Sequence, residues 1–425
     1  MTKISFYTLG CRLNQSETAS IQNSFEANGY EVVGFDKPSD IVVINTCTVT
    51  ENGDADTRRL VNKVNRLNPH ARIALVGCQA QVQKEKLVLM PNVRWIVGNS
   101  RKMDLVSVFK ENPDPCQAAV IAPVIEREPF TQPVASIDHQ HTRANIKIQD
   151  GCDFFCSFCE IPYARGRARS RVFEDILQET RALAAAGHKE IILTGVNIGT
   201  YAYENKSLLD VIKILAAIDG LKRIRISSIE PTTIPVELLD YMGKGQLCRY
   251  LHIPLQSGSD EMLTEMRRKY TATEFSRFIQ KAHQKVPQIC IGTDVIVGFP
   301  GETDKYFEQT VDLIREGPIH YVHVFSYSPR HMAQSRLRED NVSLHVISKR
   351  SQILRELSAR KRRIFYESLV GTVQAVLLEE ARGNFWMGLT DNYVKIKIKA
   401  QGQLHNQILS VKLQRIEGQY LIGEL

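Results

Sequence analysis

Three closely spaced cysteines directly after a short strand constrain the fold of this chain more than any other feature. Cys152, Cys156 and Cys159 stand at the spacing C-x3-C-x2-C, behind an alternating segment that begins at Ile146. A turn that leaves a sheet at this point can bring three thiolates to one face. Soft thiolates bind iron–sulfur clusters or zinc, and a four-iron cluster normally takes four of them. Three local ligands therefore leave one iron open for a substrate or cofactor.

A structural zinc site is the alternative for this triplet. Such a site closes with four ligands, usually as two C-x2-C pairs, and no second pair follows here. The sequence has no apolar leader and no run of about 18 apolar residues, so we expect a cytoplasmic protein that does not cross a membrane. In a reducing compartment its nine cysteines indicate metal binding or catalysis, because disulfides do not persist there.

A chain of 425 residues is longer than a single hydrophobic core usually accommodates, so the sequence predicts several domains. Residues 1–110 alternate short apolar strands with helices, which predicts a doubly wound parallel α/β sheet. The expected strands cover residues 2–10, 30–34, 40–47, 71–78 and 93–98, and the expected helices cover 16–28 and 54–67.

Cys11, Cys47 and Cys78 each stand at the carboxyl end of an expected strand of this sheet. Ligand sites of open α/β sheets lie at that edge, so we expect these three cysteines to meet in one crevice. A second cluster with an open iron is the interpretation that we prefer. Three small buried hydrophobic residues are the alternative, since free cysteines are often buried.

Residues 111–142 are rich in Pro and polar residues and predict a linker, in which Cys116 has no ligand partner. Residues 143–330 then repeat strand and helix. Six apolar strands are expected at 145–149, 190–193, 223–227, 250–255, 290–297 and 320–325, which predicts a partial (β/α)6 barrel. The carboxyl ends of barrel strands build active sites, and the cysteine triplet follows the first strand. Cys248 and Cys290 lie outside any ligand spacing and are expected to be structural.

Several residues at these strand ends are candidates for cofactor binding. Gly195 and Gly258 either let the backbone approach a ligand closely or are turn residues with positive φ. Glu230 and Gln256 either bind polar groups of a cofactor or cap loops, and Ser257 follows Gln256 in the same strand-end loop. The alternating run from Arg165 through Arg167 and Arg169 to Arg171 either contacts phosphates or forms a strand edge exposed to water.

The formal charge of +7 is concentrated in one segment. Between Arg330 and Arg363 there are ten Lys or Arg residues and three Asp or Glu residues. We assign residues 331–366 to a basic helical connector. A basic block beside a catalytic domain suggests a polyanionic partner such as RNA, whereas a solvated amphipathic helix is the alternative.

Residues 367–425 change to five short strands, which predicts a small antiparallel β-barrel. Small barrels often bind single-stranded nucleic acid through aromatic and basic side chains. Lys395, Lys397 and Lys399 alternate along one strand and share a face, so Lys395 and Lys397 are candidate RNA contacts. The alternative is a domain that only covers the active site.

The order of motifs along essentially the whole chain resembles that of the methylthiotransferases, which are radical S-adenosylmethionine (SAM) enzymes. The motifs are Gly10-Cys11, Asn45-Thr46-Cys47, Gly77-Cys78, the cysteine triplet with Phe158, Leu255-Gln256-Ser257-Gly258-Ser259 and Val297-Gly298-Phe299-Pro300-Gly301-Glu302. Within this family, residues 7–18 and 44–50 resemble the MtaB branch, which modifies threonylcarbamoyladenosine in tRNA.

The resemblance implies an N-terminal cluster domain, a radical SAM domain and a C-terminal barrel of the TRAM type. It implies that the triplet holds a 4Fe-4S cluster that binds and cleaves SAM, with Phe158 where the family's aromatic residue contacts the adenine. Cys11, Cys47 and Cys78 are implied to hold an auxiliary 4Fe-4S cluster that carries the sulfur. One SAM would donate the methyl group and a second would yield the adenosyl radical that leads to replacement of the adenine C2 hydrogen by methylthio.

The implied partners are a tRNA anticodon loop, an electron donor such as flavodoxin or ferredoxin, and a sulfur donor. The clusters and SAM carry the chemistry, so no catalytic side chain is expected. Three alternatives stay open: methylthiolation of isopentenyladenosine in tRNA, methylthiolation of an aspartate in a ribosomal protein, and a non-enzymatic iron–sulfur electron carrier with an RNA-binding tail.

Overall fold

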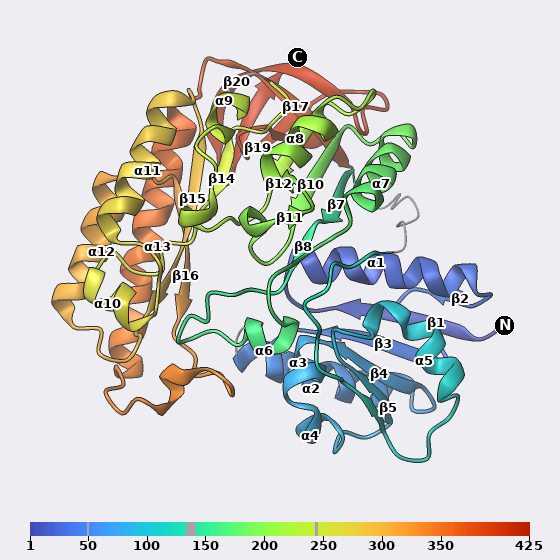
Figure 1. Cartoon of the computed structure of the whole chain (residues 1–425). Helices are drawn as coiled ribbons and strands as arrows, with labels where there is room; N and C mark the ends of the chain where they lie inside the picture. The colour runs from blue at the N-terminus through green and yellow to red at the C-terminus, as the bar shows by residue number, and fades with distance from the viewer. Residues whose placement is uncertain (49–50, 133–141, 243–244) are drawn as a thin grey trace.

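The structure, a computed structural model, describes residues 1–48, 51–132, 142–242 and 245–425, without the side chains of residues 51 and 52. In Figure 1 a blue-to-cyan α/β sheet lies at one end of the molecule, a central set of parallel strands follows, and a small red barrel lies at the opposite end. Residues 49 and 50 of the 44–50 motif, and residues 133–141 of the predicted linker, lie outside the described residues.

The N-terminal sheet has six parallel strands in the order β2-β1-β3-β4-β5-β6. Its strands are β1 (Lys3–Thr8), β2 (Glu31–Val33), β3 (Ile41–Thr46), β4 (Arg72–Gly77), β5 (Val93–Val97) and β6 (Ala119–Ile121), and its helices are α1 (Arg12–Ala27), α2 (Glu51–Leu67), α3 (Cys78–Val82), α4 (Lys84–Leu87) and α5 (Leu105–Glu111). All six residues of β3 are buried, as expected for a central parallel strand. Phe25 of α1 and Val61 of α2 pack in two separate cores of this sheet. The doubly wound sheet is therefore confirmed.

Six parallel strands form the central part in two hydrogen-bonded groups. One group contains β7 (Arg143–Lys147), β10 (Glu190–Thr194) and β13 (Arg223–Ile226), and the other contains β14 (Tyr250–His252), β15 (Cys290–Val297) and β16 (Tyr321–Ser326). A bridge between Ser228 and His252 joins the groups. The helices of this part are α7 (Phe173–Ala185), α8 (Leu208–Ala216), α9 (Leu238–Met242), α10 (Asp260–Glu265), α11 (Ala272–Lys285) and α12 (Asp304–Glu316). The partial barrel is confirmed, and mainly aliphatic side chains from these strands and helices form one large core.

Short elements surround the first central strand. After β7 come β8 (Gln149–Asp150), α6 (Ile161–Arg165) and β9 (Arg169–Ser170), and the paired strands β11 (Ala202–Tyr203) and β12 (Lys206–Ser207) follow β10. Strands β8 and β9 pair with each other, so the triplet and α6 lie in the connection of a hairpin.

The long helix α13 (Leu344–Glu367) runs beside β16 and leads into the small barrel (Figure 1). The barrel closes in the order β17-β18-β19-β21-β20, formed by β17 (Val373–Arg382), β18 (Phe385–Thr390), β19 (Lys395–Lys399), β20 (Ile408–Glu417) and β21 (Tyr420–Glu424). The pairing of β19 with β21 is parallel, which corrects the expectation of a fully antiparallel barrel. The reason is parity, because strand directions cannot alternate completely around a closed ring of five.

Two further element boundaries differ from the expectation. Helix α1 begins at Arg12 and not near residue 16, with Cys11 at its N-cap. Strand β6 lies inside the predicted linker, where its residues pair with β5 at the edge of the sheet. None of the helices in the described part of the chain is both long and apolar enough to span a bilayer.

Candidate functional site

The cysteine triplet lies on the loop between β8 and α6, and each sulfur has a hydrogen-bond donor. The backbone N–H of Phe154 donates to Cys152 Sγ (3.5 Å) and that of Ile161 donates to Cys159 Sγ (3.4 Å). Arg268 Nη1 donates to Cys156 Sγ (3.2 Å). Hydrogen bonds to the sulfurs are among the protein's means of tuning an iron–sulfur cluster, so this donor set fits one.

Burial controls the ionisation of these three thiols. It raises the pKa of the Cys152 thiol to about 11, and it raises the pKa values of Cys156 and Cys159 as well. Such thiols hold their protons at neutral pH unless a metal replaces the protons.

A cavity of about 190 Å³, which we call the triplet cavity, lies beside Cys159. The cavity is lined by Thr48, Phe158, Cys159, Glu160, Ile161, Gln256, Asp294, Ile296, Phe325, Ser326, Tyr327, Ser328 and Arg330. Phe158 and Gln256, two of the predicted cofactor contacts, line this cavity, and their contact with a cofactor stays a prediction. The aromatic ring, polar groups and small volume suit a nucleoside-like ligand.

Gln256 is the clearest unsatisfied group of the triplet cavity. Its backbone has a φ of 67°, in the left-handed region that residues other than glycine rarely occupy. Its Oε1 is buried and has no hydrogen-bond partner among the described residues. A buried acceptor without a partner is costly, so this site fits a ligand that donates a hydrogen bond to Oε1.

Glu230 lies close to the triplet through Arg268. Its carboxylate pairs with Arg268 Nη2, and the same guanidinium contacts Cys156 Sγ. Burial raises the pKa of Glu230, although Arg268 opposes that shift. A contact between Glu230 and a cofactor stays a prediction.

The other strand-end candidates support the protein's own loops. A Cβ at Gly195 would lie 2.9 Å from the backbone oxygen of Gln149, and one at Gly258 would lie 2.6 Å from Cα of Thr310. Neither glycine has positive φ, so close approach of the backbone explains both. Ser257 is buried against Thr310 (Oγ to Oγ1 3.3 Å) and is not among the residues that line the triplet cavity. Contacts of Gly195 and Ser257 with a cofactor stay a prediction.

The structure brings the ends of β1, β3 and β4 side by side, and with them Cys11, Cys47 and Cys78. The glycines before Cys11 and Cys78 permit this arrangement. A Cβ at Gly10 (φ 87°) would lie 2.6 Å from Cys47 Sγ, and one at Gly77 (φ 99°) would lie 2.5 Å from Asn45 Oδ1. The three cysteines therefore follow adjacent strand ends at one sheet edge, while their meeting in one crevice and their role as cluster ligands stay predictions.

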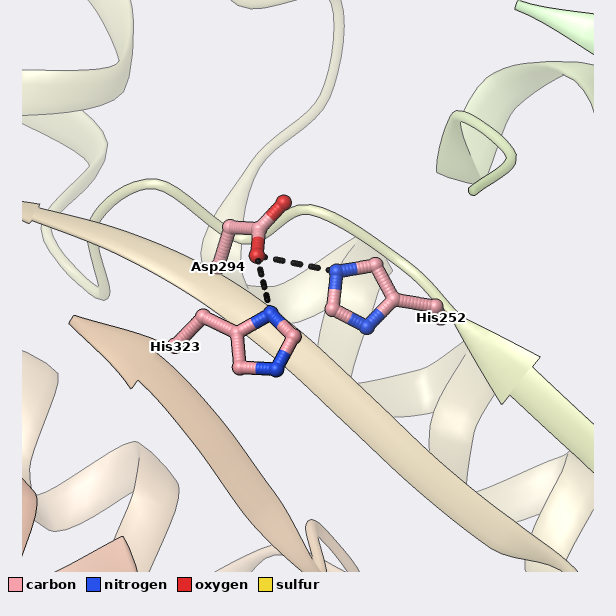
Figure 2. Close-up of side chains that lie close together, drawn as sticks. All are labelled: His252, Asp294 and His323. Carbon is pink, nitrogen blue, oxygen red and sulfur yellow. Dashed lines mark ion pairs between the residues drawn. The ribbon is translucent and has the colours of Figure 1, made fainter. Parts of the chain in front are cut away.

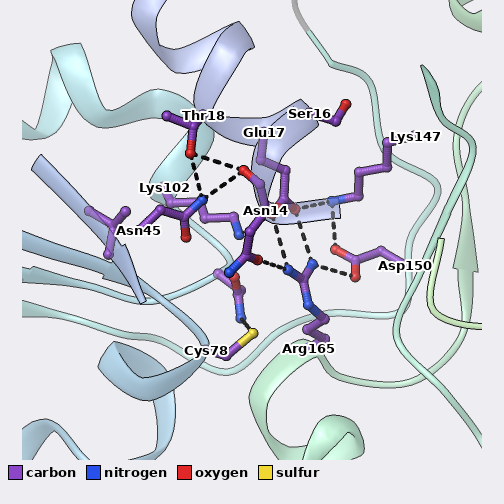
Figure 3. A network of polar contacts seen from close by, with 12 residues as sticks. Asn14, Ser16, Glu17, Thr18, Asn45, Cys78, Lys102, Lys147, Asp150 and Arg165 are labelled. Carbon is purple, nitrogen blue, oxygen red and sulfur yellow. Dashed lines mark hydrogen bonds and ion pairs between the residues drawn. The ribbon is translucent and has the colours of Figure 1, made fainter. Parts of the chain in front are cut away.

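A buried charge network fills the space next to Cys78 (Figure 3). Glu17 of α1 pairs with Lys102, with Lys147 Nζ at 2.7 Å and with Arg165 Nη1 at 3.0 Å. Asp150 pairs with Lys147 (2.7 Å) and with Arg165 (3.0 Å). Burial acts to raise the pKa of Glu17, but Arg165, Lys102 and Lys147 hold that pKa well below its usual range. Three buried cations thus share two carboxylates beside Cys78, an excess of positive charge that fits an anionic cluster there.

Arg165 is not available to RNA, which corrects the prediction for this residue. Its side chain is buried, donates to Asn14 Oδ1 (2.6 Å) and pairs with both carboxylates of the network. Arg171 is also buried, between Asp175 and Glu179. Arg167 is exposed, with its guanidinium carbon 4.5 Å from the centroid of the Phe155 ring, so an RNA contact of Arg167 stays a prediction.

The N-terminal sheet contacts the loop that carries the cysteine triplet, through residues next to cysteines of both sets. Thr48 follows Cys47 in the chain, and Glu160 follows Cys159. The hydroxyl of Thr48 donates a hydrogen bond to Glu160 Oε2 (2.9 Å). Asn99 Nδ2 donates to the backbone oxygen of Ala164 (2.7 Å) and lies 3.5 Å from Cys78 Sγ. These buried hydrogen bonds hold α6 against α3.

A polar cluster on the central strands was missed by the sequence analysis (Figure 2). His252 Nε2 lies 2.9 Å from Asp294 Oδ1, and His323 Nδ1 lies 3.3 Å from the same oxygen. Burial acts to raise the pKa of Asp294, but the two imidazoles hold that pKa well below its usual range. The available signal was an ionisable residue inside each of three largely apolar strand segments.

A basic groove was also missed. A cavity of about 960 Å³ lies between α2, α4 and the segment after β16, and Arg58, Lys86, His331 and Arg336 line it. Arg330 lines both this groove and the triplet cavity, and pairs with Asp54 Oδ2 at 2.6 Å. Its Nη1 is buried and has no partner within the described residues.

The lysines of β19 lie on the outer side of the small barrel, as their alternation predicts. Lys395 and Lys399 are exposed, while Lys397 pairs with Glu417 Oε1 (3.0 Å). RNA contacts of Lys395 and Lys397 stay a prediction. Cys116 is exposed, and Cys248 and Cys290 are buried.

Two family models match the chain. One described as the radical SAM superfamily matches residues 146–314, and one described as the uncharacterized protein family UPF0004 matches residues 3–98. The first range contains the cysteine triplet, and the second contains Cys11, Cys47 and Cys78.

Curated relatives match over nearly the whole length. A threonylcarbamoyladenosine tRNA methylthiotransferase MtaB of Bacillus subtilis (strain 168) is 35% identical over 100% of this chain and 96% of its own. A tRNA-2-methylthio-N(6)-dimethylallyladenosine synthase of Lachnoclostridium phytofermentans is 31% identical over 98% of this chain and 94% of its own.

Among solved structures, the radical S-adenosylmethionine methyltransferase TsrM from Kitasatospora setae has a similar fold, with a TM-score of 0.59. It is 13% identical, and the match covers 76% of this chain and 73% of that chain.

Proposed function

The chain belongs to the family of radical SAM tRNA methylthiotransferases, and from this premise we propose that it transfers a methylthio group to C2 of N6-threonylcarbamoyladenosine next to the anticodon of tRNA. The observation that carries the proposal is the pair of three-cysteine sets on opposite sides of one contact, joined by the hydrogen bond from Thr48 to Glu160. The identity of 35% to an MtaB relative, against 31% to a dimethylallyladenosine synthase, favours the threonylcarbamoyl branch.

The expected cofactors are SAM and two 4Fe-4S clusters. Cys152, Cys156 and Cys159 would hold one cluster, and Cys11, Cys47 and Cys78 the other. When bound, these groups supply a radical that removes the unactivated C2 hydrogen and a methylated sulfur that replaces it. A radical is needed because that hydrogen has no acidity for a base to use at neutral pH.

The protein's own residues position the cofactor and exclude water. Gln256 Oε1, buried without a partner among the described residues, would accept a hydrogen bond from SAM, and Phe158 would stack on the adenine. Arg268, held by Glu230, donates to the sulfur of Cys156 and offsets negative charge there. The hydrogen bond of Thr48 to Glu160 joins the segments that follow Cys47 and Cys159, so a substrate base bound beside it would be near both cysteine sets.

The basic groove and the small barrel offer the tRNA contacts. Arg58, Lys86 and Arg336 are exposed around the groove that shares Arg330 with the triplet cavity. Phosphate contacts by such side chains would give a salt-dependent affinity. Lys395 and Lys397 on the barrel, which we propose to be a TRAM domain, would add contacts to the anticodon loop. The target base would be unstacked, as bases in RNA loops can be.

We extend the proposal to the partners and to the division of the chain. An electron donor such as flavodoxin or ferredoxin would reduce the triplet cluster, and a separate donor would renew the sulfur, in the cytoplasm. The proposed domains are 1–110 for the auxiliary cluster, 143–330 for radical chemistry and 367–425 for RNA. The segments 111–142 and 331–366 would connect them.

The test compares anaerobically reconstituted protein with its cysteine variants. We expect about eight irons in the intact chain, about four in Cys152→Ala/Cys156→Ala/Cys159→Ala, and about eight in the matched control Cys116→Ala. Only about four irons in the intact chain and none in the triple variant would contradict the auxiliary site. A failure of the reduced protein to cleave SAM would favour the electron carrier.

The substrate is tested with anticodon stem-loops that carry threonylcarbamoyladenosine or isopentenyladenosine, followed by mass spectrometry of the nucleosides. We expect methylthio only on the first. Methylthiolation of the isopentenyl RNA alone, or of a ribosomal protein aspartate, would overturn the assignment of the branch.

A further inference from the structure

One face of β16 connects the triplet cavity with a second cavity. Tyr321, His323 and Phe325 alternate along the strand and therefore share a face. Phe325 lines the triplet cavity, whereas Tyr321 and His323 line a separate cavity of about 180 Å³, the His323 cavity. Phe325 is 39% exposed and the His323 side chain is 54% exposed, although both lie on a barrel strand. The part of this face from His323 to Phe325 is thus open to a ligand, whereas Tyr321 is buried.

The His323 cavity is aromatic and basic. It is lined by Cys290, His320, Tyr321, His323, Arg362, Phe365, Tyr366, Tyr393, Lys395 and Gln419. Arg362 of α13 and Lys395 of β19 carry positive charge, and no Asp or Glu is present among the lining residues. Neither cation has a carboxylate partner within the described parts of the chain. Arg362 instead lies 5.5 Å from the centroid of the Tyr321 ring. The cavity therefore suits an anion.

Among the described residues, Asp294 forms no ion pair with Arg362 or Lys395, because its carboxylate contacts His252 and His323 instead. Its Oδ1 accepts from His252 and from His323 Nδ1. His252 Nδ1 is in turn 3.0 Å from the Tyr321 hydroxyl, which lies 2.6 Å from that of Tyr250. These contacts hold the His323 ring by one nitrogen and leave Nε2 for a ligand (Figure 2).

The spacing between Phe325 and His323 along β16 is close to the length of the N6 substituent of the proposed substrate nucleoside. Two residues of a strand, from Phe325 to His323, span about 6.7 Å. A carbamoyl-threonine unit has the covalent backbone of roughly one and a half extended residues, so its carboxylate lies about 5 Å beyond N6. A base beside Phe325 would therefore place that carboxylate at the mouth of the His323 cavity.

Resting on the proposed function, we propose that the His323 cavity is the subsite that binds the threonyl carboxylate of the substrate nucleoside, with Arg362 and His323 as its partners. A guanidinium binds a carboxylate through charge-assisted hydrogen bonds, and His323 can add one only with a protonated ring, which donates Nδ1–H to Asp294 and Nε2–H to the ligand. An apolar N6 substituent would gain nothing from these groups and would leave them without a partner. The cavity therefore selects the threonylcarbamoyl nucleoside over its isopentenyl counterpart.

The experiment measures affinity for three stem-loop RNAs that differ only at the target base: unmodified adenosine, threonylcarbamoyladenosine, and the analogue with a carboxamide in place of the carboxylate. We expect the reconstituted protein to prefer the carboxylate over the carboxamide by about 10- to 100-fold. In Arg362→Gln and in His323→Gln the preference should shrink towards one. In both variants, KM for the threonylcarbamoyl RNA should rise by a larger factor than kcat falls. The affinity for the unmodified RNA should stay unchanged. Arg363→Gln, at the next position of α13, is the control and should keep the preference.

Three results would overturn this subsite. The first is an unchanged preference in both variants. The second is an equal loss of affinity for all three RNAs, which would show that the cavity binds a backbone phosphate. The third is a wild-type protein that methylthiolates the carboxylate and carboxamide RNAs equally well; there the proposed function would survive without the subsite. A protein that leaves the threonylcarbamoyl RNA unmodified and acts on another base would instead refute the proposed function itself.

Discussion

Replacing Glu17 by glutamine should destabilise the N-terminal sheet, because this buried carboxylate holds three cations. It pairs with Lys102, Lys147 and Arg165, and the side chains of all four residues are at most 4% exposed. The amide keeps the size of the side chain but removes its charge. Removing one partner from a buried ion pair costs about 3–5 kcal/mol, since the remaining charges stay desolvated. We expect a loss of that size in the free energy of unfolding.

The assay follows urea unfolding by the fluorescence of Trp95, which is buried in the N-terminal sheet. Because the chain has two tryptophans, Trp386→Phe makes Trp95 the sole reporter. With a denaturant slope of about 2 kcal/mol/M, the midpoint should fall by about 1.5–2.5 M. The control Glu111→Gln removes a carboxylate that is 56% exposed beside Arg101, and should cost less than about 1 kcal/mol.

A double variant separates charge from packing. Lys102 pairs with Glu17, so Glu17→Gln/Lys102→Met removes one of the unpaired cations. The double variant should lose less free energy of unfolding than the two single variants lose together. The difference, which is the coupling energy between the two residues, should be about 1–3 kcal/mol. A midpoint for Glu17→Gln equal to that of Glu111→Gln, or strictly additive effects, would refute the reasoning.

Three further predictions follow from the same contacts. Gly10→Ala places a Cβ 2.6 Å from Cys47 Sγ, so reconstituted protein should lose about four irons, whereas Gly29→Ala, at a similar φ with no atom within 4 Å, should keep them. Arg165→Met should leave the salt dependence of RNA affinity unchanged, while Lys395→Gln should reduce its slope by about one; the reverse pattern would return Arg165 to the RNA surface. The pKa values of Glu17 and Asp150 are lowered by their cations against the opposing effect of burial, so their stabilisation is complete above about pH 4 and is lost as pH falls through the folded-state values. The Trp95 urea midpoint should therefore drop below pH 4 in the wild type and drop less steeply in Glu17→Gln.

The sequence by itself determined the parallel sheets, the two cysteine sets and the basic helix. These features depend on local spacing and on the periodicity of apolar residues, which a short window of sequence contains. The parallel sheet carried more information still. Because carboxyl ends of parallel strands share one edge, Cys11, Cys47 and Cys78 could be brought together without knowledge of any contact.

The tertiary structure alone decided what happens to individual charges. Arg165 looked like its exposed neighbour Arg167, yet it is buried because Glu17 and Asn14, far away in sequence, pack against it. His252, Asp294 and His323 come from three strands and form a cluster only in the assembled barrel. The free energy of a polar group depends on which partners and how much water surround it. Those surroundings come from segments far apart in the chain, so no local pattern contains them.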